Sequence, residues 1–497
     1  MRGNDTNRGT CSHRTVERQG EKPTYKLDMH PNPQRLQVAF DIVAPCEYHS
    51  DSVQMFVALQ DDLMRFVLDV LYLLAALAYS PIIIYRAIRH KRYRKGWAQR
   101  FGKIRRRSPA KRCIWLHAVS MGEVNAAKTI VEELARRFGD FEIVISTTTD
   151  TGFARATTLF SKSYEIFYFP FDFSCVMSRV FNSLRPAICL LMELEVWPNF
   201  VSIAQKRDVP VVVINGRISD RGFARYGRIK PFARKVFRNV SLILAQTQEY
   251  AERFMALGAA AQNVVVTGSL KYDTAQITDK VEGTDALAAQ LALGGQRLWV
   301  AGATGPGEEK IVLDVFSQLK KSEHFKDLRL AVVPRKPERF DEVAQLIEQS
   351  GFKLIRYSEV KKKAVESTEK SKIADVVLGD TMGDLRKFYC LATVIFVGRS
   401  LVPMGGSDMM EAAALGKCTF FGPHTFNFTQ TVEALLADEG AIVANDQGQL
   451  LDVVQKCLLE PQYAQEIARK GREVIRRNQG ATTKTIERIT AILGKPS

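Results

Sequence analysis

Residues 113–134 of this 497-residue chain read CIWLHAVSMGEVNAAKTIVEEL, and this segment holds the smallest repeating unit of the fold. Apolar and β-branched residues run without a break to about Val119, which is typical of a buried strand. From about Val124 the apolar residues recur at helical spacing. Gly122 lies between the two, where the backbone must turn. A strand that leads directly into an amphipathic helix predicts a parallel α/β sheet.

The same unit recurs along the chain in two series. In the first series, which ends near Leu270, the strand-like runs are CIWLHAV, EIVISTTT, EIFYFPFD, AICLLMELE, VPVVVINGRI, LILAQTQ and NVVVTGSL. A polar, alanine-rich connector follows over residues 271–296. The second series is RLWVAGAT, LRLAVVPR, KLIRYSE, DVVLGDT, ATVIFVGRS, KCTFFGP and AIVAN. We predict an α/β protein of two Rossmann-like domains, residues 91–270 and 297–497, that face each other across a cleft at the carboxyl ends of their strands.

The segment before the first domain has a polar part and an apolar part. Residues 1–63 show little apolar periodicity and are predicted to be disordered. Residues 70–85 form an uncharged run of sixteen, somewhat short of the roughly 20 apolar residues of a spanning helix. We therefore predict a membrane-anchor helix over residues 64–90, with a buried core helix as the alternative. Translation could also start at Met64.

Positive charge is concentrated directly after this apolar run. The chain has 70 Lys and Arg against 54 Asp and Glu, and thirteen of the sixteen net positive charges lie in residues 86–112, where no acidic residue occurs. The rest of the chain is nearly balanced, which argues against a nucleic-acid partner. A basic flank beside an apolar helix predicts that this side is cytoplasmic and attracts the anionic lipids of the inner membrane.

Cysteine and histidine spacing indicates neither disulfides nor a metal site. The eight cysteines include no C-x-x-C pair, and several lie inside apolar runs, so we expect reduced thiols in a cytosolic compartment. No Cys/His ligand spacing occurs, so no metal site is predicted and no cofactor is expected.

Glu123 follows the first strand and lies at the start of the helix after it. One interpretation is purely structural, because Ser120 and Glu123 have the S-x-x-E spacing of a capping box. The other is chemical, because a carboxylate at a helix start is kept ionised by the helix dipole and could deprotonate an alcohol. The residues alone leave both interpretations open.

Two further clusters lie at strand ends of the first domain. Glu193 and Glu195 close an otherwise apolar strand, and buried acids are costly unless they are paired or used. Both a role in the cleft and a satisfied ion pair remain open for them. Arg217 and Arg221 follow the next strand at helical spacing, either as a solvated basic face or as ligands for phosphate groups of an acceptor.

Strand ends of the second domain carry side chains suited to a phosphorylated ligand. Gly405 and Gly406 precede a helix expected to begin near Asp408, and Gly-rich loops before helices bind phosphate. Glu411, one turn later, could accept hydrogen bonds from ribose hydroxyls. The chain contains no P-loop run and no Asp-x-Asp run for a metal-bound nucleoside diphosphate. These features favour a donor with a single phosphate.

Twelve segments occur in an order that identifies a family. They are HAVSMGEV, STTTDTGFARA, YFPFD, MELEVWPN, NGRISDR, AQTQEYAERFMALGA, VTGSLKYD, VVPRKPERF, VVLGDTMGDL, GRSL, EAAALGK and GPHTFNF. In this order they resemble the 3-deoxy-D-manno-octulosonate (Kdo) transferases that modify lipid A. The resemblance implies a GT-B fold, CMP-Kdo as donor, a lipid A precursor as acceptor, and an N-terminal anchor at the cytoplasmic face of the inner membrane.

The resemblance also implies roles for single residues. Glu123 corresponds to the catalytic base. The positions that correspond to CMP contacts are Pro334, Arg335, Met382, Gly383, Asp384, Asp408, Met409, Met410 and Glu411. The chain departs from the family at residues 405–411, which read GGSDMME instead of the common Gly-Gly-His-Asn-Pro-Leu-Glu, and at Gly305 and Pro306, which replace part of a Thr-His-x-Gly-Glu-Glu run. A carboxylate at position 408 would oppose a phosphate unless it caps the helix.

The predicted reaction is inverting transfer of Kdo from CMP-Kdo to a lipid A precursor. Glu123 would act as general base, and Glu193 or Glu195 would stabilise an oxocarbenium-like transition state. One rival is another two-domain sugar transferase or epimerase that uses a UDP donor. The other is a membrane-tethered binding protein that holds nucleic acid or lipid with the basic run of residues 86–112.

Overall fold

The computed structural model describes residues 48–89, 95–366 and 374–494. Residues 1–47 of the predicted disordered segment and residues 90–94 of the basic run lie outside this range. The chain separates into two compact units, one up to Asp62 and one from Leu63 to Ser497. The second unit contains both predicted Rossmann-like domains.

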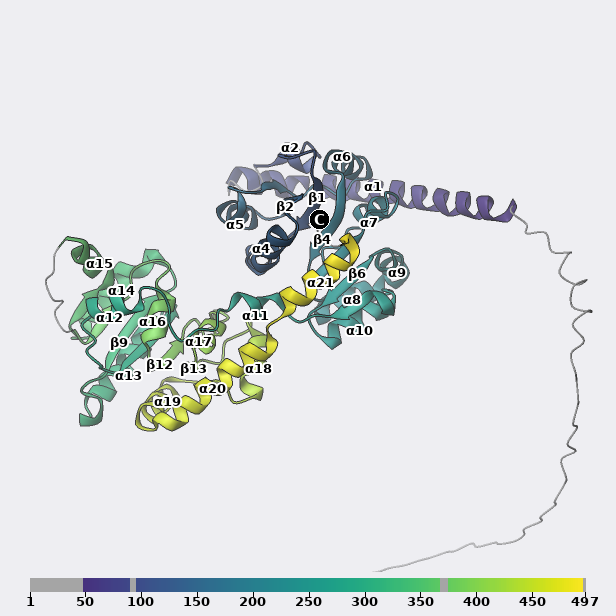
Figure 1. Ribbon diagram of the computed structural model, residues 1–497. Helices are drawn as coiled ribbons and strands as arrows, with labels where there is room; N and C mark the ends of the chain where they lie inside the picture. The colour runs from purple at the N-terminus through teal and green to yellow at the C-terminus, as the bar shows by residue number, and fades with distance from the viewer. Residues whose placement is uncertain (1–47, 90–94, 367–373, 495–497) are drawn as a thin grey trace, which may run out of the picture. The chain divides into compact units, whose positions relative to one another are not determined.

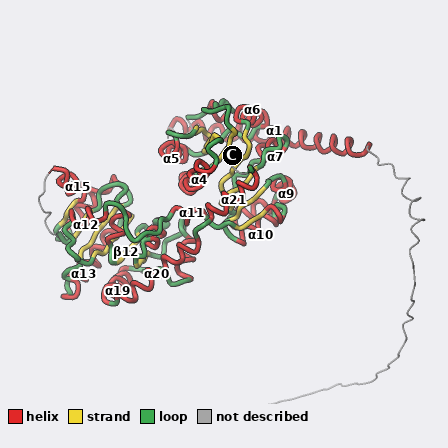
Figure 2. The backbone as a smooth tube through the Cα atoms, viewed as in Figure 1, coloured by secondary structure: helices red, strands yellow, loops and turns green. Residues whose placement is uncertain are grey.

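The first domain is built on a seven-stranded parallel sheet in the order β3-β2-β1-β4-β5-β6-β7. Its strands are β1 (Arg112–His117), β2 (Phe141–Thr147), β3 (Glu165–Tyr168), β4 (Pro186–Met192), β5 (Val211–Gly216), β6 (Leu242–Ala245) and β7 (Val264–Val266). Its helices are α2 (Trp97–Arg100), α3 (Met121–Ala126), α4 (Lys128–Arg137), α5 (Asp150–Phe160), α6 (Ser174–Leu184), α7 (Pro198–Gln205), α8 (Asp220–Arg228), α9 (Lys230–Arg238), α10 (Gln248–Ala256) and α11 (Leu270–Thr274). The central strands are apolar at nearly every position because helices cover both faces of the sheet (Figure 2).

The second domain repeats this architecture with the sheet order β10-β11-β9-β8-β12-β13-β14, again all parallel. Its strands are β8 (Leu298–Thr304), β9 (Arg329–Pro334), β10 (Leu354–Arg356), β11 (Val376–Leu378), β12 (Val394–Val397), β13 (Cys418–Phe421) and β14 (Ile442–Val443). The helices from residue 284 onward are α12 (Thr284–Gln290), α13 (Glu308–Lys320), α14 (Phe340–Gln349), α15 (Tyr357–Glu366), α16 (Leu385–Leu391), α17 (Met410–Ala414), α18 (Thr429–Ala437), α19 (Gln447–Leu459), α20 (Pro461–Asn478) and α21 (Ala481–Leu493), and all but α21 belong to this domain. The predicted fold class is confirmed.

The strand order locates the places where each sheet can bind a ligand. In open parallel sheets a ligand binds beyond the carboxyl ends of the strands where the order reverses. The reversal lies between β1 and β4 in the first sheet and between β8 and β12 in the second. The loops at these points contain Glu123 and Glu193 in the first domain, and Gly305 and Arg399 in the second.

The last helix of the chain belongs to the core of the first domain. In Figure 1, α21, drawn in yellow, lies over the first sheet. Its buried residues Ala481, Ile486 and Ile489 join the same hydrophobic cluster as Ile130 and Leu134 of α4. The predicted domain boundaries placed this helix in the second domain, because nothing in its own residues shows which sheet it covers.

The apolar N-terminal helix is longer than the predicted anchor. Helix α1 runs from Tyr48 to Arg89, so residues 48–63, which we expected to be disordered, are helical. Within the described residues it alone is long and apolar enough to cross a membrane, with a mean hydropathy of 1.7 over Leu63–Ile82. No part of that window is buried, so the alternative of a core helix is wrong.

Two polar side chains of α1 attach it to the first domain. The carboxylate of Asp69 accepts hydrogen bonds from the backbone N–H and hydroxyl of Ser174, and from Nδ2 of Asn199 at 3.0 Å. The Tyr72 hydroxyl donates to Asp172 at 3.1 Å. The helix is therefore fixed to the domain on one side, while large apolar side chains such as Leu74 and Leu77 are exposed.

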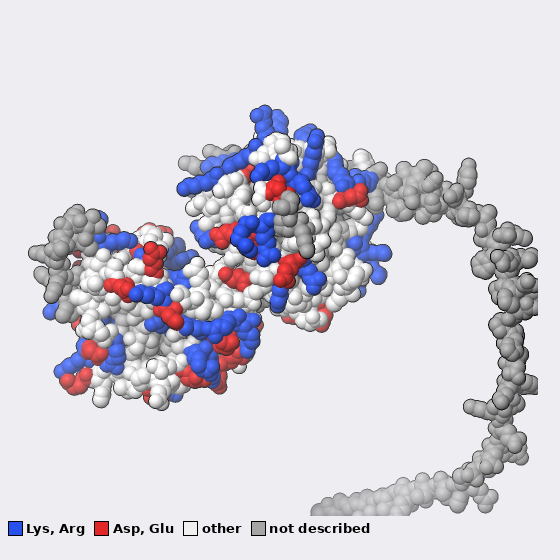
Figure 3. Space-filling view, viewed as in Figure 1, with Lys and Arg blue, Asp and Glu red and all other residues white. Residues whose placement is uncertain are grey.

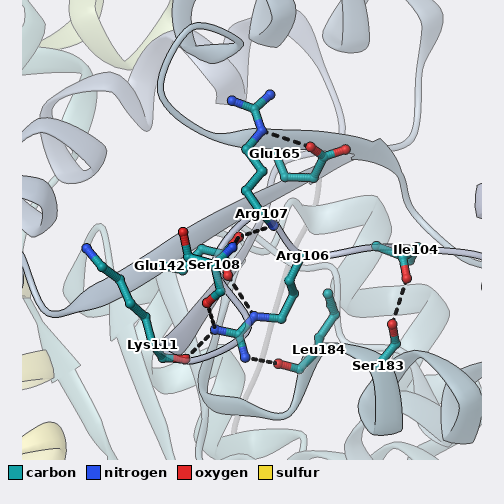
Figure 4. A network of polar contacts seen from close by, with 9 residues as sticks. All are labelled: Ile104, Arg106, Arg107, Ser108, Lys111, Glu142, Glu165, Ser183 and Leu184. Carbon is teal, nitrogen blue, oxygen red and sulfur yellow. Dashed lines mark hydrogen bonds and ion pairs between the residues drawn. The ribbon is translucent and has the colours of Figure 1, made fainter.

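Part of the basic run forms ion pairs with strands of the first domain rather than a surface patch (Figure 4). Arg106 is almost fully buried and pairs with Glu142 on β2 at 2.7 Å, and its guanidinium also donates to the carbonyl of Leu184. Arg107 pairs with Glu165 on β3 at 3.0 Å. Other Lys and Arg side chains of the first domain gather on its surface over α2 and α6 (Figure 3). Within the described part of the basic run, Lys95, Lys103 and Arg105 are exposed.

Candidate active site

Glu123 forms the capping box that its sequence spacing indicates. The Ser120 hydroxyl accepts a hydrogen bond from the Glu123 backbone N–H at 3.4 Å and donates to its Oε1 at 2.9 Å. The other carboxylate oxygen accepts from the backbone N–H of Val119 at 2.9 Å. These contacts hold the carboxylate in one place at the carboxyl end of β1. They agree with the structural interpretation and leave the chemical one possible, because a fixed carboxylate is also what a general base requires.

The protonation equilibrium of Glu123 differs from the one we expected. Burial, together with the negative charge of Glu193, raises the pKa of Glu123 to about 7, against the lowering effect of the hydrogen bonds from Val119 and Ser120. The expectation that the helix dipole keeps this carboxylate ionised is therefore wrong. Helix α3 has only six residues, and the loss of hydration outweighs it. A carboxylate with a pKa near 7 can take up a proton and release it at neutral pH.

Glu193 and Glu195 follow β4, beside β1 in the sheet, and no ion pair of either is found among the described residues. Glu193 has a left-handed backbone with φ 57°, and its N–H donates to the carbonyl of Ile214 at 3.0 Å. Glu195 accepts a hydrogen bond from Nε1 of Trp197 at 3.0 Å. Burial raises the pKa of Glu195, and Glu193 adds to the effect. The ion-pair alternative has no support here, and three carboxylates influence one another electrostatically at this edge.

A cavity of about 490 Å³ joins elements of both domains. From the predicted CMP contacts it is lined by Arg335, Asp408, Met410 and Glu411. The other lining residues are Gly122, Asn125 and Ala126 from the first domain, and Lys271, Thr274, Ala303, Leu385, Arg399, Gly406, Ser407, Asn427 and Phe428. Gly122 precedes Glu123, so the loop that carries the proposed base reaches the rim of this cavity.

The cavity contains two acidic residues, Asp408 at the start of α17 and Glu411 within it. Oδ1 of Asp408 accepts a hydrogen bond from the backbone N–H of Met410, the first residue of α17, at 2.9 Å. Asp408 thus caps the helix, the arrangement that makes its carboxylate tolerable beside a phosphate. Burial raises the pKa of Asp408 and of Glu411, and Arg335 lowers both.

The second predicted CMP segment lies outside this cavity. Asp384 is held by Lys361 at 3.0 Å and Lys387 at 2.8 Å, and although burial would raise its pKa, these cations and the Thr381 hydroxyl lower it to about 2. Met382 is exposed, and Gly383 has the positive φ of a turn. Pro334 ends β9 and Met409 is buried beneath the loop. CMP contacts by these residues stay a prediction.

The predicted acceptor-binding arginines differ in environment. Arg221 lies in the first turn of α8 and is exposed, as expected of a solvated basic face. Arg217 is half-buried, and its Nε has no hydrogen-bond partner among the described residues. Neither side chain lines the cavity, so contact with an acceptor stays a prediction.

Four basic or amide side chains of the cavity were not anticipated as site residues: Asn125, Lys271, Arg399 and Asn427. Asn125 lies in the opening segment of residues 113–134, and the others lie in VTGSLKYD, GRSL and GPHTFNF. Position after a strand is therefore the signal that could have found Arg399. Lys271 lies in α11, between the two domains, and only the tertiary structure shows that its side chain reaches the second one.

Comparison with known proteins places the chain in a family. A family model described as 3-deoxy-D-manno-octulosonic-acid transferase (kdotransferase) matches residues 95–274. A 3-deoxy-D-manno-octulosonic acid transferase of Haemophilus influenzae is 32% identical over 403 residues, which are 81% of this chain and 92% of that protein. The chain belongs to the Kdo transferase family. The resemblance inferred from the ordered segments is thus confirmed.

Solved structures extend the comparison of this Kdo transferase family member to the fold. The UDP-GlcNAc 2-epimerase of Neisseria meningitidis bound to UDP-GlcNAc is 12% identical with a TM-score of 0.50, and covers 76% of this chain and all of that one. This likeness concerns the two-domain GT-B architecture alone. The C-terminal CMP-Kdo binding domain of WaaA from Acinetobacter baumannii is 29% identical with a TM-score of 0.35, and covers 39% of this chain and 97% of that one.

Proposed function

We propose that this family member transfers Kdo from CMP-Kdo to a lipid A precursor, lipid IVA, with inversion at the anomeric carbon and with Glu123 as general base. The observation that carries the proposal is the cavity in which the Glu123 loop of the first domain meets Arg335, Lys271 and Glu411. An activated hydroxyl and a leaving phosphate must be brought together for glycosyl transfer, and this cavity brings the backbone next to Glu123 close to two cations suited to the phosphate.

The proposed step moves one proton and exchanges one bond. A hydroxyl of the acceptor gives its proton to Glu123, and its oxygen forms a bond to the anomeric carbon as the bond from that carbon to the phosphate oxygen breaks. CMP leaves with the bonding electron pair, and Arg335 and Lys271 stabilise the added negative charge. Glu193 and Glu195 favour the oxocarbenium-like carbon, because their carboxylates lie at the same edge of the first sheet.

Glu411 is suited to the nucleoside of the donor. Glu411, the second residue of α17, lines the cavity near Asp408 and Arg335. A carboxylate accepts hydrogen bonds from the two ribose hydroxyls of CMP and repels a second phosphate. The charge distribution therefore favours a nucleoside monophosphate donor over a UDP donor.

The acceptor is a lipid, and the N-terminal region is suited to bring the site to it. We place the protein at the cytoplasmic face of the inner membrane, held by α1 and by the Lys and Arg side chains over α2 and α6. Asp69 and Tyr72 fix α1 to the first domain, so membrane attachment would also fix the acceptor domain against the lipid surface. Arg217 and Arg221 would meet the phosphate groups of the acceptor.

The test is Glu123→Gln in the full chain, with CMP-Kdo, a lipid A precursor and mass analysis of the product. Transfer should fall roughly 10²- to 10⁴-fold, since general-base catalysis contributes about that much in rate. CMP should still bind, and more tightly than UDP. The matched control is Glu132→Gln, which removes an exposed carboxylate from α4 and should leave transfer unchanged. Near-normal turnover by Glu123→Gln would reject the assignment of the base, and failure of the unaltered protein to transfer Kdo would reject the function.

A further inference from the structure

A buried carboxylate ties together the two loops at the point where the second sheet reverses its strand order. Glu308, at the start of α13, is fully buried. Its oxygens accept hydrogen bonds from the backbone N–H groups of Gly305 at 2.9 Å, Ser400 at 2.7 Å and Leu401 at 2.9 Å, and also from that of Arg399. One side chain thus satisfies four backbone donors and fixes the loop after β8 to the loop after β12.

Arg399 is held by these contacts in a backbone conformation that its residue type disfavours. Its φ is 60°, in the left-handed region that residues with a side chain seldom adopt. Its N–H is bound by Glu308, and its carbonyl accepts from the N–H of Gly406 at 2.7 Å. Strained residues that the surrounding structure enforces gather at functional sites. The strain here determines where the Arg399 side chain leaves the loop.

The Arg399 side chain lines the cavity and has spare donors. Nη2 donates to the carbonyl of Met404 at 3.3 Å, and no carboxylate forms an ion pair with this guanidinium within the described part of the chain. A guanidinium has five N–H donors in a planar fork. A Cβ atom added to Gly305 would lie 3.1 Å from Cγ of Arg399 and 2.6 Å from Sδ of Met404. Because Gly305 has no side chain, the side chains of Arg399 and Met404 can lie against its backbone.

We infer that Arg399 binds the carboxylate of the donor sugar and so selects an acidic sugar, an inference that rests on the proposed function. The proposed donor carries two separate anionic groups, a phosphate and the carboxylate of an ulosonic acid. Arg335 and Lys271 serve the phosphate, while Asp408 and Glu411 in the same cavity would repel an unpaired sugar carboxylate. The planar fork of Arg399 matches a carboxylate with two parallel hydrogen bonds. A lysine can offer the charge but not this geometry.

The experiment separates the two anionic groups of the donor, because CMP carries the phosphate and lacks the carboxylate. The KM for CMP-Kdo and the inhibition constant of CMP are measured for the unaltered full chain, Arg399→Gln and Arg399→Lys. Arg399→Gln should raise the KM for CMP-Kdo roughly 10- to 100-fold, as expected for loss of a charged hydrogen-bonded pair, and should leave CMP inhibition within about twofold. Arg399→Lys should restore part of this loss. The control Lys336→Gln removes an exposed cation on the same side of the sheet and should change neither constant.

A second variant tests the placement of the guanidinium without removing it. Gly305→Ala would push Sδ of Met404 aside and crowd Cγ of Arg399, and it should raise the KM for CMP-Kdo in the same direction, again with CMP inhibition unchanged. The inference is overturned if Arg399→Gln weakens CMP inhibition as much as it raises the KM, which would assign Arg399 to the phosphate, or if it changes neither constant. If the unaltered protein neither transfers Kdo nor binds CMP, the proposed function itself fails, which is a different result from an active protein that is indifferent to Arg399.

Discussion

At the scale of single residues, Glu123 shows how burial changes the chemistry that a motif indicates. The capping-box hydrogen bonds would lower its pKa, as would a helix dipole. Burial and the charge of Glu193, a residue seventy positions away, act in the other direction and raise the pKa to about 7. The environment thus converts an ordinary surface-type carboxylate into one that exchanges a proton at neutral pH.

This pKa gives transfer a defined pH dependence. Glu123 acts as a base only when ionised, so kcat/KM should fall as the pH drops through about 7. Glu193→Gln removes a negative charge that disfavours the ionised form, so the pKa of Glu123 should fall and the acidic limb of the pH profile should move to lower pH. The measurement is kcat/KM from pH 5 to 9 for both proteins. An acidic limb at the same pH in Glu193→Gln would contradict the electrostatic coupling, whatever happens to the maximum rate.

At the scale of elements, the basic segment before β1 is attached to β2 and β3 by ion pairs. Its position after an apolar helix indicates a lipid-facing patch. On that expectation, all thirteen Lys and Arg side chains of residues 86–112 would be exposed to lipid. The structure instead places Arg106 against the buried Glu142 of β2, with additional bonds to backbone carbonyls. A buried cation with a full set of acceptors belongs to the fold and cannot also bind lipid.

These two ion pairs predict a difference in stability between variants of two adjacent arginines. Arg106→Ala leaves the carboxylate of Glu142 buried without its partner and should lower the free energy of unfolding by about 3–5 kcal/mol. Arg107→Ala breaks an exposed pair with Glu165 and should cost about 0–1 kcal/mol. Denaturant unfolding of the two variants checks the difference. Equal losses would show that the pair with Glu142 is not the source of the stability.

At the scale of the whole molecule, the chain returns to its first domain after completing its second. Helix α21 buries Ile486 and Ile489 against α4, and Thr482 meets Thr129 through a hydrogen bond between their hydroxyls at 2.9 Å. The first domain therefore lacks part of its core until the last residues are in place. A domain defined by sequence alone would be cut at the wrong point.

Substitutions in the C-terminal helix α21 should therefore destabilise the first domain, whose other elements precede residue 275 in the sequence. Ile486→Ala should cost about 2–5 kcal/mol, the usual range for an isoleucine truncated in a core. The loss should appear as faster hydrogen exchange in β1 and α4 of the first domain. Arg488→Ala, on the exposed side of the same helix, should leave exchange there unchanged. Faster exchange confined to the second domain would contradict the packing.

Much of the fold and part of the site could be predicted from short segments. Each of the fourteen strands in the described residues overlaps one of the runs quoted from the sequence, because a strand buried on both faces must be apolar at almost every position. The capping box of Glu123 was equally local, since it needs only Ser120 three residues earlier. Membership of the family followed from the order of the segments, and the comparisons confirm it.

The sequence by itself thus determined the two α/β domains, the family and the strand ends that carry the candidate site residues, because each of these depends on residues close together in the chain. Only the tertiary structure decided the pKa of Glu123, the space at Gly305 that Arg399 fills, the burial of Arg106, and the return of α21 to the first domain. Each of these depends on the distance between atoms that lie far apart in the sequence, and electrostatic and packing energies follow that distance rather than sequence separation.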